Sequence, residues 1–69
     1  METLQISLAA ARINAKMTQE DVARKMHVSK GTIVNWESGK ISPKHVQLCF
    51  LSELYGIPVD NIFLPKVST

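Results

Sequence analysis

Two helix-start signals lie close together near the middle of the chain and limit the length of any helix between them. Thr18 and Ser29 each carry a hydroxyl that can accept a hydrogen bond from a backbone amide in the first turn of a helix. Gly39 follows as a stop signal, because glycine readily adopts the left-handed conformation that ends many helices. The spacing therefore predicts two short helices between residues 19 and 38, joined by a turn of about three residues.

Apolar residues at helical spacing predict which faces of these two helices point inward. Val22, Ala23 and Met26 form the predicted inward face of the first helix, where the small alanine allows the second helix to approach closely. Ile33 and Trp36, three positions apart, form the inward face of the second helix. Two short helices joined by a tight turn make a helix-turn-helix unit, whose outer face is free to contact another molecule.

The rest of the chain predicts three further helical segments and no strand. The first covers about residues 4–15. The next is capped by Ser42, begins at Pro43 and ends at Gly56, and a short helical turn follows over residues 57–64. A chain of 69 residues has room for one small domain, so we expect a compact all-α fold of five helices.

Composition excludes several classes of function. The single cysteine, Cys49, excludes an internal disulfide and a multi-cysteine metal site, and it fits a reducing cytoplasm. No apolar run approaches the roughly 20 residues that span a membrane. Neither His27 nor His45 has a partner at the spacing of a metal site or a catalytic triad. We therefore expect a cytoplasmic protein with no catalytic residues, cofactor, metal, small-molecule substrate or membrane partner.

Positive charge is concentrated in the middle of the chain, although the net charge is only +2. Between Arg12 and Lys44, lysine and arginine outnumber the acidic residues, whereas the remainder of the chain is slightly acidic. A basic region attracts polyanions, and nucleic acid is the first candidate. From charge alone, however, an ordinary solvated surface explains this distribution better.

Two stretches together resemble a known family. "TQEDVARKMHVSKGTIVNWESGK", residues 18–40, and "LSELYGIPVDNIF", residues 51–63, are similar to the helix-turn-helix and the final two helices of the Cro/C1-type, phage-repressor-like DNA-binding family. The resemblance covers about residues 6–64. It implies a compact five-helix lambda-repressor-like domain over residues 1–64, with residues 65–69 forming a C-terminal tail or the start of a linker.

The resemblance also implies a function. The family's third helix enters the major groove of double-stranded DNA, so we expect a sequence-specific transcriptional regulator. We expect a repressor of phage or mobile-element type that binds an operator as a homodimer. The residues placed to touch base edges are Ser29, Lys30, Gly31, Val34 and Asn35. The residues placed to touch DNA phosphates are Lys16, Gln19, Ser38, Lys40, Lys44 and His45.

The side chains at the base-reading positions suit different bases. Lys30 can donate to guanine O6 and N7, Asn35 can form two hydrogen bonds with adenine, and Val34 can contact a thymine methyl. Gly31 offers no side chain, and two interpretations stay open. It either permits a close approach to DNA or is simply tolerated near a helix start.

The resemblance assigns structural roles to three other positions. Arg12 and Glu37 match an ion pair that ties the family's first helix to its recognition helix. His27 stands in the turn, where the family usually has glycine. Histidine adopts the left-handed conformation less readily than glycine, so we expect slight strain at His27.

Apolar residues on the fourth predicted helix and near the end of the chain can form a surface for a partner. Val46 and Phe50 lie nearly opposite the core face of the fourth helix, and they are either a stray apolar pair or part of a contact surface. The resemblance implies that dimerisation uses the region of the last helices. The residues expected on a dimer or partner surface are Val46, Phe50, Ile62, Phe63 and Leu64. The alternative function is a protein-interaction module of the same fold, such as an antitoxin or an anti-repressor partner.

Overall fold

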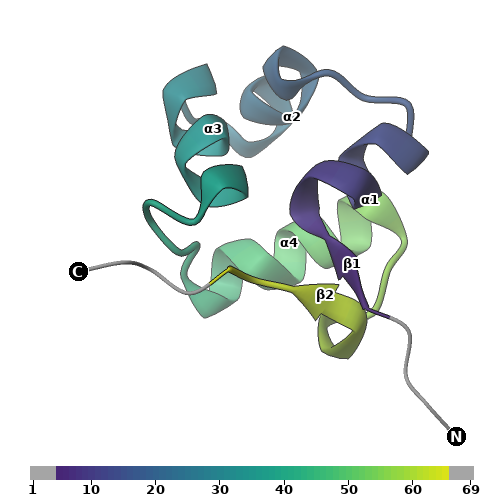
Figure 1. The fold of residues 1–69 in the computed structure, drawn as a ribbon. Coiled ribbons are helices and arrows are strands. Elements are labelled where there is room, and N and C mark those ends of the chain that lie inside the picture. Colours follow the sequence, from purple (N-terminus) through teal and green to yellow (C-terminus); the bar gives the residue numbers. More distant parts are fainter. Residues whose placement is uncertain (1–4, 66–69) are drawn as a thin grey trace, which may run out of the picture.

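Four α-helices make up most of the domain in the computed structural model, which describes residues 5–65 (Figure 1). The elements in chain order are β1 (Ile6–Ser7), α1 (Leu8–Asn14), α2 (Gln19–Met26), α3 (Lys30–Ser38), α4 (His45–Tyr55), η1 (Val59–Asn61) and β2 (Ile62–Phe63). The paired strands lie at one end of the domain, and α2 and α3 lie at the other. Residue 4 of the first predicted helix and residues 66–69 of the predicted tail fall outside the described residues.

The two central helices begin and end at the signals in the sequence. Thr18 Oγ1 accepts a hydrogen bond from the Asp21 amide at 3.0 Å, and Asp21 Oδ2 accepts one from the Thr18 amide at 2.9 Å. Ser29 Oγ accepts from the Thr32 amide at 3.2 Å. Gly39 ends α3 with a left-handed φ of 83°. Both predicted caps are confirmed, because each hydroxyl accepts a hydrogen bond from an amide in the first turn of its helix.

The fourth helix begins two residues later than predicted. It starts at His45 with Lys44 as its cap, so the prediction that Ser42 caps a helix beginning at Pro43 is wrong. The Lys44 amide donates to Gln47 Oε1 at 2.8 Å, so a glutamine three residues further on closes the first turn. Pro43 lies in the preceding loop, where its side chain is buried.

The fifth predicted helix is reduced to a single 3₁₀ turn, η1, after which the chain becomes extended. β2 then pairs in parallel with β1, with Ile6 opposite Ile62 and Ser7 opposite Phe63. The prediction of no strands is therefore wrong, and the helical structure consists of four α-helices and one short turn. Burial favours this arrangement, because the extended backbone places the β-branched Ile62 in the core at 7 % exposure.

The core draws side chains from all four α-helices and from β2. Its largest fully buried side chains are Ile33, Leu51 and Val22. Within residues 5–65, the buried hydrophobic residues of the core are Leu8, Ala11, Val22, Ala23, Ile33, Trp36, Leu48, Leu51, Tyr55 and Ile62. The predicted inward faces of α2 and α3 are thus confirmed, with Met26 packed against their edge. No helix within residues 5–65 is long and apolar enough to cross a membrane.

Candidate nucleic-acid interface

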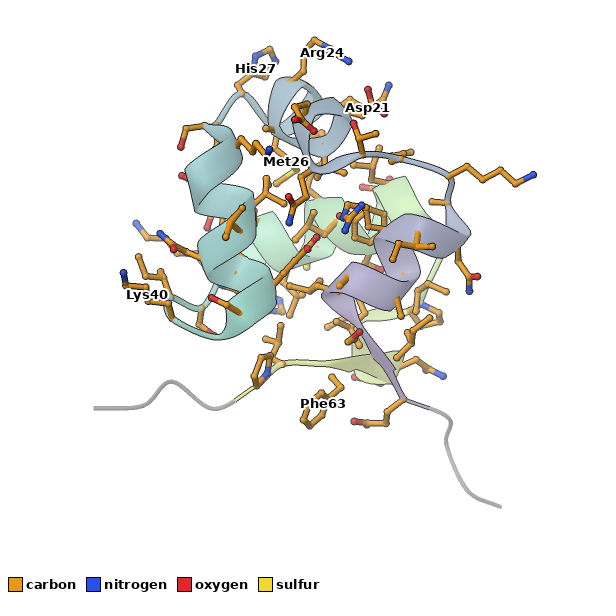
Figure 2. All side chains as sticks on the ribbon, turned by 45° about the horizontal axis from the view of Figure 1, so that its top comes forward. Asp21, Arg24, Met26, His27, Lys40 and Phe63 are labelled. Carbon is orange, nitrogen blue, oxygen red and sulfur yellow. The ribbon has the colours of Figure 1, made fainter. Side chains whose placement is uncertain are left out.

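The turn between α2 and α3 fixes the angle of the helix-turn-helix unit. His27 ends α2 in the left-handed conformation, with φ 58° and ψ 43°. The Val28 amide donates to the Ala23 carbonyl at 3.0 Å, which satisfies one of the last carbonyls of α2. Figure 2 shows the His27 ring directed away from the domain, beside the exposed Arg24. Histidine therefore occupies the conformation that the family usually gives to glycine, as the sequence predicts.

The outer face of α3 is exposed along its first two turns. Ile33 and Trp36 anchor the helix from behind, at 2 % and 3 % exposure. Lys30 and Gly31 are exposed, and Val34 is 40 % exposed although it is apolar. Val34 thus presents an aliphatic surface to whatever approaches this face.

The other two predicted base-reading residues are more constrained. Ser29 is exposed, but its hydroxyl already caps α3 and lies 3.0 Å from Thr32 Oγ1. Asn35 is half-buried, and its carbonyl accepts hydrogen bonds from the Ser38 hydroxyl and the Ile41 amide. The Asn35 backbone is therefore held by the loop that follows α3.

Gly31 has no structural reason to be glycine within this chain. A Cβ built at this position would meet only Ser29 Oγ, at the ordinary contact distance of 3.7 Å. Its φ is not positive, unlike those of Gly39 and Gly56. Since glycine inside a helix is destabilising by roughly 0.5–1 kcal/mol relative to alanine, its presence here is not explained by folding.

Most of the predicted phosphate-binding side chains are exposed, and four of the six lie between the end of α3 and the start of α4. Lys40 extends from the loop after α3, at the opposite end of that helix from His27 (Figure 2). The loop is shaped by Ser38, whose hydroxyl donates to the Asn35 carbonyl and accepts from the Lys40 amide at 3.4 Å. The other exposed members of the set are Lys16, Lys44 and His45. His45 Nε2 lies 3.5 Å from Cys49 Sγ one turn along α4, so the prediction that His45 has no partner at ligand spacing is wrong, although the two residues belong to no larger ligand group within residues 5–65.

A cluster of three side chains joins α1, α2 and α3 behind this surface. Arg12 Nε donates to Glu37 Oε2 at 2.7 Å, and Gln19 Nε2 donates to Glu37 Oε1 at 3.0 Å. Arg12 Nη1 also donates to the Met17 carbonyl at 2.9 Å. The Arg12 and Glu37 side chains are only 14 % and 9 % exposed. The hydrogen bond with Glu37 raises the pKa of the Arg12 guanidinium, so Arg12 stays charged at neutral pH.

The structure adds one contact on the outer surface that sequence reasoning missed. Lys30 Nζ lies 3.1 Å from Glu20 Oε2, so an ion pair joins the first turn of α3 to the first turn of α2. A hydrogen bond with its own backbone and the neighbouring Lys30 lower the pKa of Glu20. No local spacing rule could identify this pair, because it depends on how the two helices pack.

The predicted partner surface divides into exposed and buried members. Val46, Phe50 and Phe63 are 78 %, 49 % and 52 % exposed, and Figure 2 shows Phe63 directed away from the domain. Ile62 belongs to the core at 7 % exposure, so its side chain contributes little to any exposed surface. Leu64 is half-buried. Among residues 5–65 no group of three or more potential ligands could hold a metal ion.

Comparison with known proteins gives a consistent assignment. A family model described as helix-turn-helix matches residues 8–62. An uncharacterized HTH-type transcriptional regulator of Methanocaldococcus jannaschii is 39 % identical over 49 residues, which cover 70 % of this chain and 73 % of that protein. The HTH-type transcriptional activator BcrR of Enterococcus faecalis is 33 % identical over 55 residues, covering 80 % of this chain but only 27 % of the activator. No solved structure matches.

These matches cover the segment that carries the capped helices, the left-handed turn and the exposed face of α3. The chain therefore belongs to the Cro/C1-type helix-turn-helix family of DNA-binding transcriptional regulators, which are not enzymes.

Proposed function

We propose that this protein regulates transcription by binding a specific double-stranded DNA operator, with α3 in the major groove. The observation that carries the proposal is the division of α3 into two faces. Ile33 and Trp36 hold one face in the core, while Lys30, Gly31 and Val34 are exposed on the other. An α-helix fits the major groove, where every base pair presents a distinct pattern of donors and acceptors.

Individual base contacts follow from the chemistry of this exposed face. Lys30 donates to guanine O6 or N7, Val34 contacts a thymine methyl, and the half-buried Asn35 pairs with adenine. Ser29 contributes less than the sequence alone indicates, because its hydroxyl is engaged in the helix cap. The absence of a side chain at Gly31 brings the backbone of α3 close to the DNA.

Phosphate contacts position the helix in the groove. Lys40, Lys44 and His45 lie between the end of α3 and the start of α4. Their exposed side chains are proposed to donate to the phosphates of one DNA strand. The hydrogen bond from Gln19 Nε2 to Glu37 orients the Gln19 amide and uses one of its two N–H protons. We propose that the second N–H donates to a DNA phosphate. Lys16 is a peripheral contact. Because these contacts release counterions, binding weakens steeply as salt is raised.

A single module of this size buries little DNA surface, so useful affinity requires two copies. We propose a homodimer on a pseudo-palindrome with half-sites one helical turn, or about 34–36 Å, apart. Phe63, Val46 and Phe50 supply exposed apolar area for the dimer contact. Regulation is proposed to be repression of phage or mobile-element type, by a domain over residues 1–64 that is followed by a tail or by the start of a linker.

The test is selection of bound duplexes from a random DNA pool, followed by affinity measurements with Asn35→Ala. Loss of a two-hydrogen-bond base contact weakens discrimination by about 1–3 kcal/mol, so roughly a five- to 150-fold loss of affinity for the selected duplex is expected. Asn14→Ala is the matched control, since Asn14 is exposed at the end of α1. Failure to recover any preferred duplex, or equal affinities for both variants, would refute the proposal.

The second candidate function is protein binding through the exposed side of α4. Val46 and Phe50 favour it, because an apolar pair this exposed is poorly explained by folding. Phe50→Ser separates the two functions. If this substitution abolishes regulation in cells while affinity for the selected duplex is unchanged, the protein-interaction module is the better description.

A further inference from the structure

The lysine proposed to read a base is held differently from the lysines proposed to touch phosphates. Lys30 Nζ is 3.1 Å from Glu20 Oε2, whereas Lys40 and Lys44 form no ion pair among the described residues. The other two acidic residues of this region are committed elsewhere, Asp21 to Arg24 and Glu37 to Arg12. Glu20 is therefore the carboxylate that pairs with the Lys30 ammonium among the described residues.

A lysine in this position is not there for helix stability. Lys30 is the first residue of α3, and a positive charge at a helix N-terminus opposes the helix dipole. Pairing with Glu20 offsets that repulsion and restricts a long, flexible side chain. The pair remains accessible to another molecule, since the two side chains are 53 % and 58 % exposed.

We propose that Glu20 is a positioning residue that makes the Lys30 contact specific for a base. This inference rests on the proposed function, because it assumes that α3 lies in the groove. An ammonium group has three protons. One forms a hydrogen bond with Glu20 Oε2, and the other two can form hydrogen bonds with guanine O6 and N7. The same carboxylate repels phosphate oxygens and competes for Lys30, so it weakens contacts that carry no sequence information.

Glu20→Gln tests this role, because it removes the charge and nearly preserves the side-chain shape. The probes are a duplex recovered by selection and the same duplex with its half-sites scrambled. We expect the variant to bind the scrambled duplex more tightly without a matching gain on the selected one. The ratio of the two affinities should fall roughly two- to fivefold, the range given by exposed ion pairs.

Salt dependence provides a second readout that a purely structural role would not change. Once Lys30 is released to contact a phosphate, the slope of log affinity against log salt for the scrambled duplex should steepen by up to about 0.9. Glu53→Gln is the matched control, because it makes the same charge change on an exposed position of α4. It should leave both the affinity ratio and the slope unchanged relative to the parent protein.

The substitution is repeated in a Lys30→Gln background, where the mechanism predicts that Glu20→Gln no longer alters the ratio. An unchanged or increased ratio in the single variant overturns the proposal. So does a decrease that persists without Lys30, or one that Glu53→Gln reproduces. A parent protein that prefers no duplex refutes the proposed function itself, which is a different result from an intact preference that Glu20→Gln does not affect.

Discussion

Gly31→Ala should make the protein more stable and a weaker DNA binder. The added Cβ meets only Ser29 Oγ at 3.7 Å, an ordinary contact, and the backbone at this position is helical. Replacing glycine by alanine in a helix therefore stabilises the fold by about 0.5–1 kcal/mol. For a domain of this size each kcal/mol shifts Tm by roughly 4–8 °C, so Tm should rise by about 2–8 °C.

Thermal melting followed by circular dichroism measures this shift, and Gly56→Ala is the control. Gly56 has φ 69°, and a Cβ there would meet nothing within 4 Å. An alanine at Gly56 has room but is held in the left-handed conformation, which costs roughly 1–2 kcal/mol, so Tm should fall. The two substitutions are chemically identical and should shift Tm in opposite directions.

Affinity for the selected duplex then decides between the two interpretations of Gly31. If the α3 backbone approaches the DNA closely, the more stable variant binds less tightly because its methyl group must be accommodated. If affinity is unchanged while Tm rises, Gly31 is only tolerated and the close-approach interpretation is wrong. A fall in Tm would refute the packing argument itself.

Three further predictions concern stability. Arg12→Ala leaves the buried Glu37 carboxylate without its main partner, so the free energy of unfolding measured by chemical denaturation should fall by about 3–5 kcal/mol. Arg24→Ala is the control, because it breaks an exposed pair and should lower that free energy by no more than about 1 kcal/mol. His27→Gly should raise Tm, because a residue with φ 58° is relieved of left-handed strain by glycine, and a clear fall would show that the histidine ring stabilises the turn. The hydrogen bonds between Asp21 and Thr18 lower the pKa of the Asp21 carboxyl below its ordinary 3.8. The ionised carboxylate therefore stabilises the folded state above that pH, and this stabilisation is lost as the pH falls through the lower pKa that Asp21 has in the folded protein. Melting curves of the parent protein and Asp21→Asn should therefore differ at neutral pH and converge in acid, and a constant difference would contradict this account.

The parts of the fold that the sequence predicts correctly are those governed by neighbours along the chain. Thr18 and Ser29 cap helices through amides three residues away, and Ile33 and Trp36 share a face because they are three residues apart. The start of α4 is an exception, because it is also set by a local contact but the sequence predicts it two residues too early. Ser42 is a good cap by composition, yet Gln47 supplies the hydrogen bond and the helix starts later.

The features that the sequence does not predict depend on contacts between distant segments. β1 and β2 have two residues each, too few for an alternating pattern, and the buried Ile62 lies where β2 pairs with β1. The contact of Glu20 with Lys30 is likewise set by the packing angle of α2 on α3. The candidate site was therefore predictable as a list of residues on α3, but not as an arrangement of their side chains.

The position of Glu37 limits how variants of this site can be interpreted. One carboxylate accepts hydrogen bonds from Arg12 on α1 and from Gln19 at the start of α2, while its own backbone belongs to α3. A substitution at Glu37 would therefore weaken the domain and release Gln19 together. Lost DNA binding in such a variant would not identify Glu37 as a contact residue. Gln19→Ala separates the two effects, because it removes the proposed phosphate contact and leaves the Arg12–Glu37 ion pair in place.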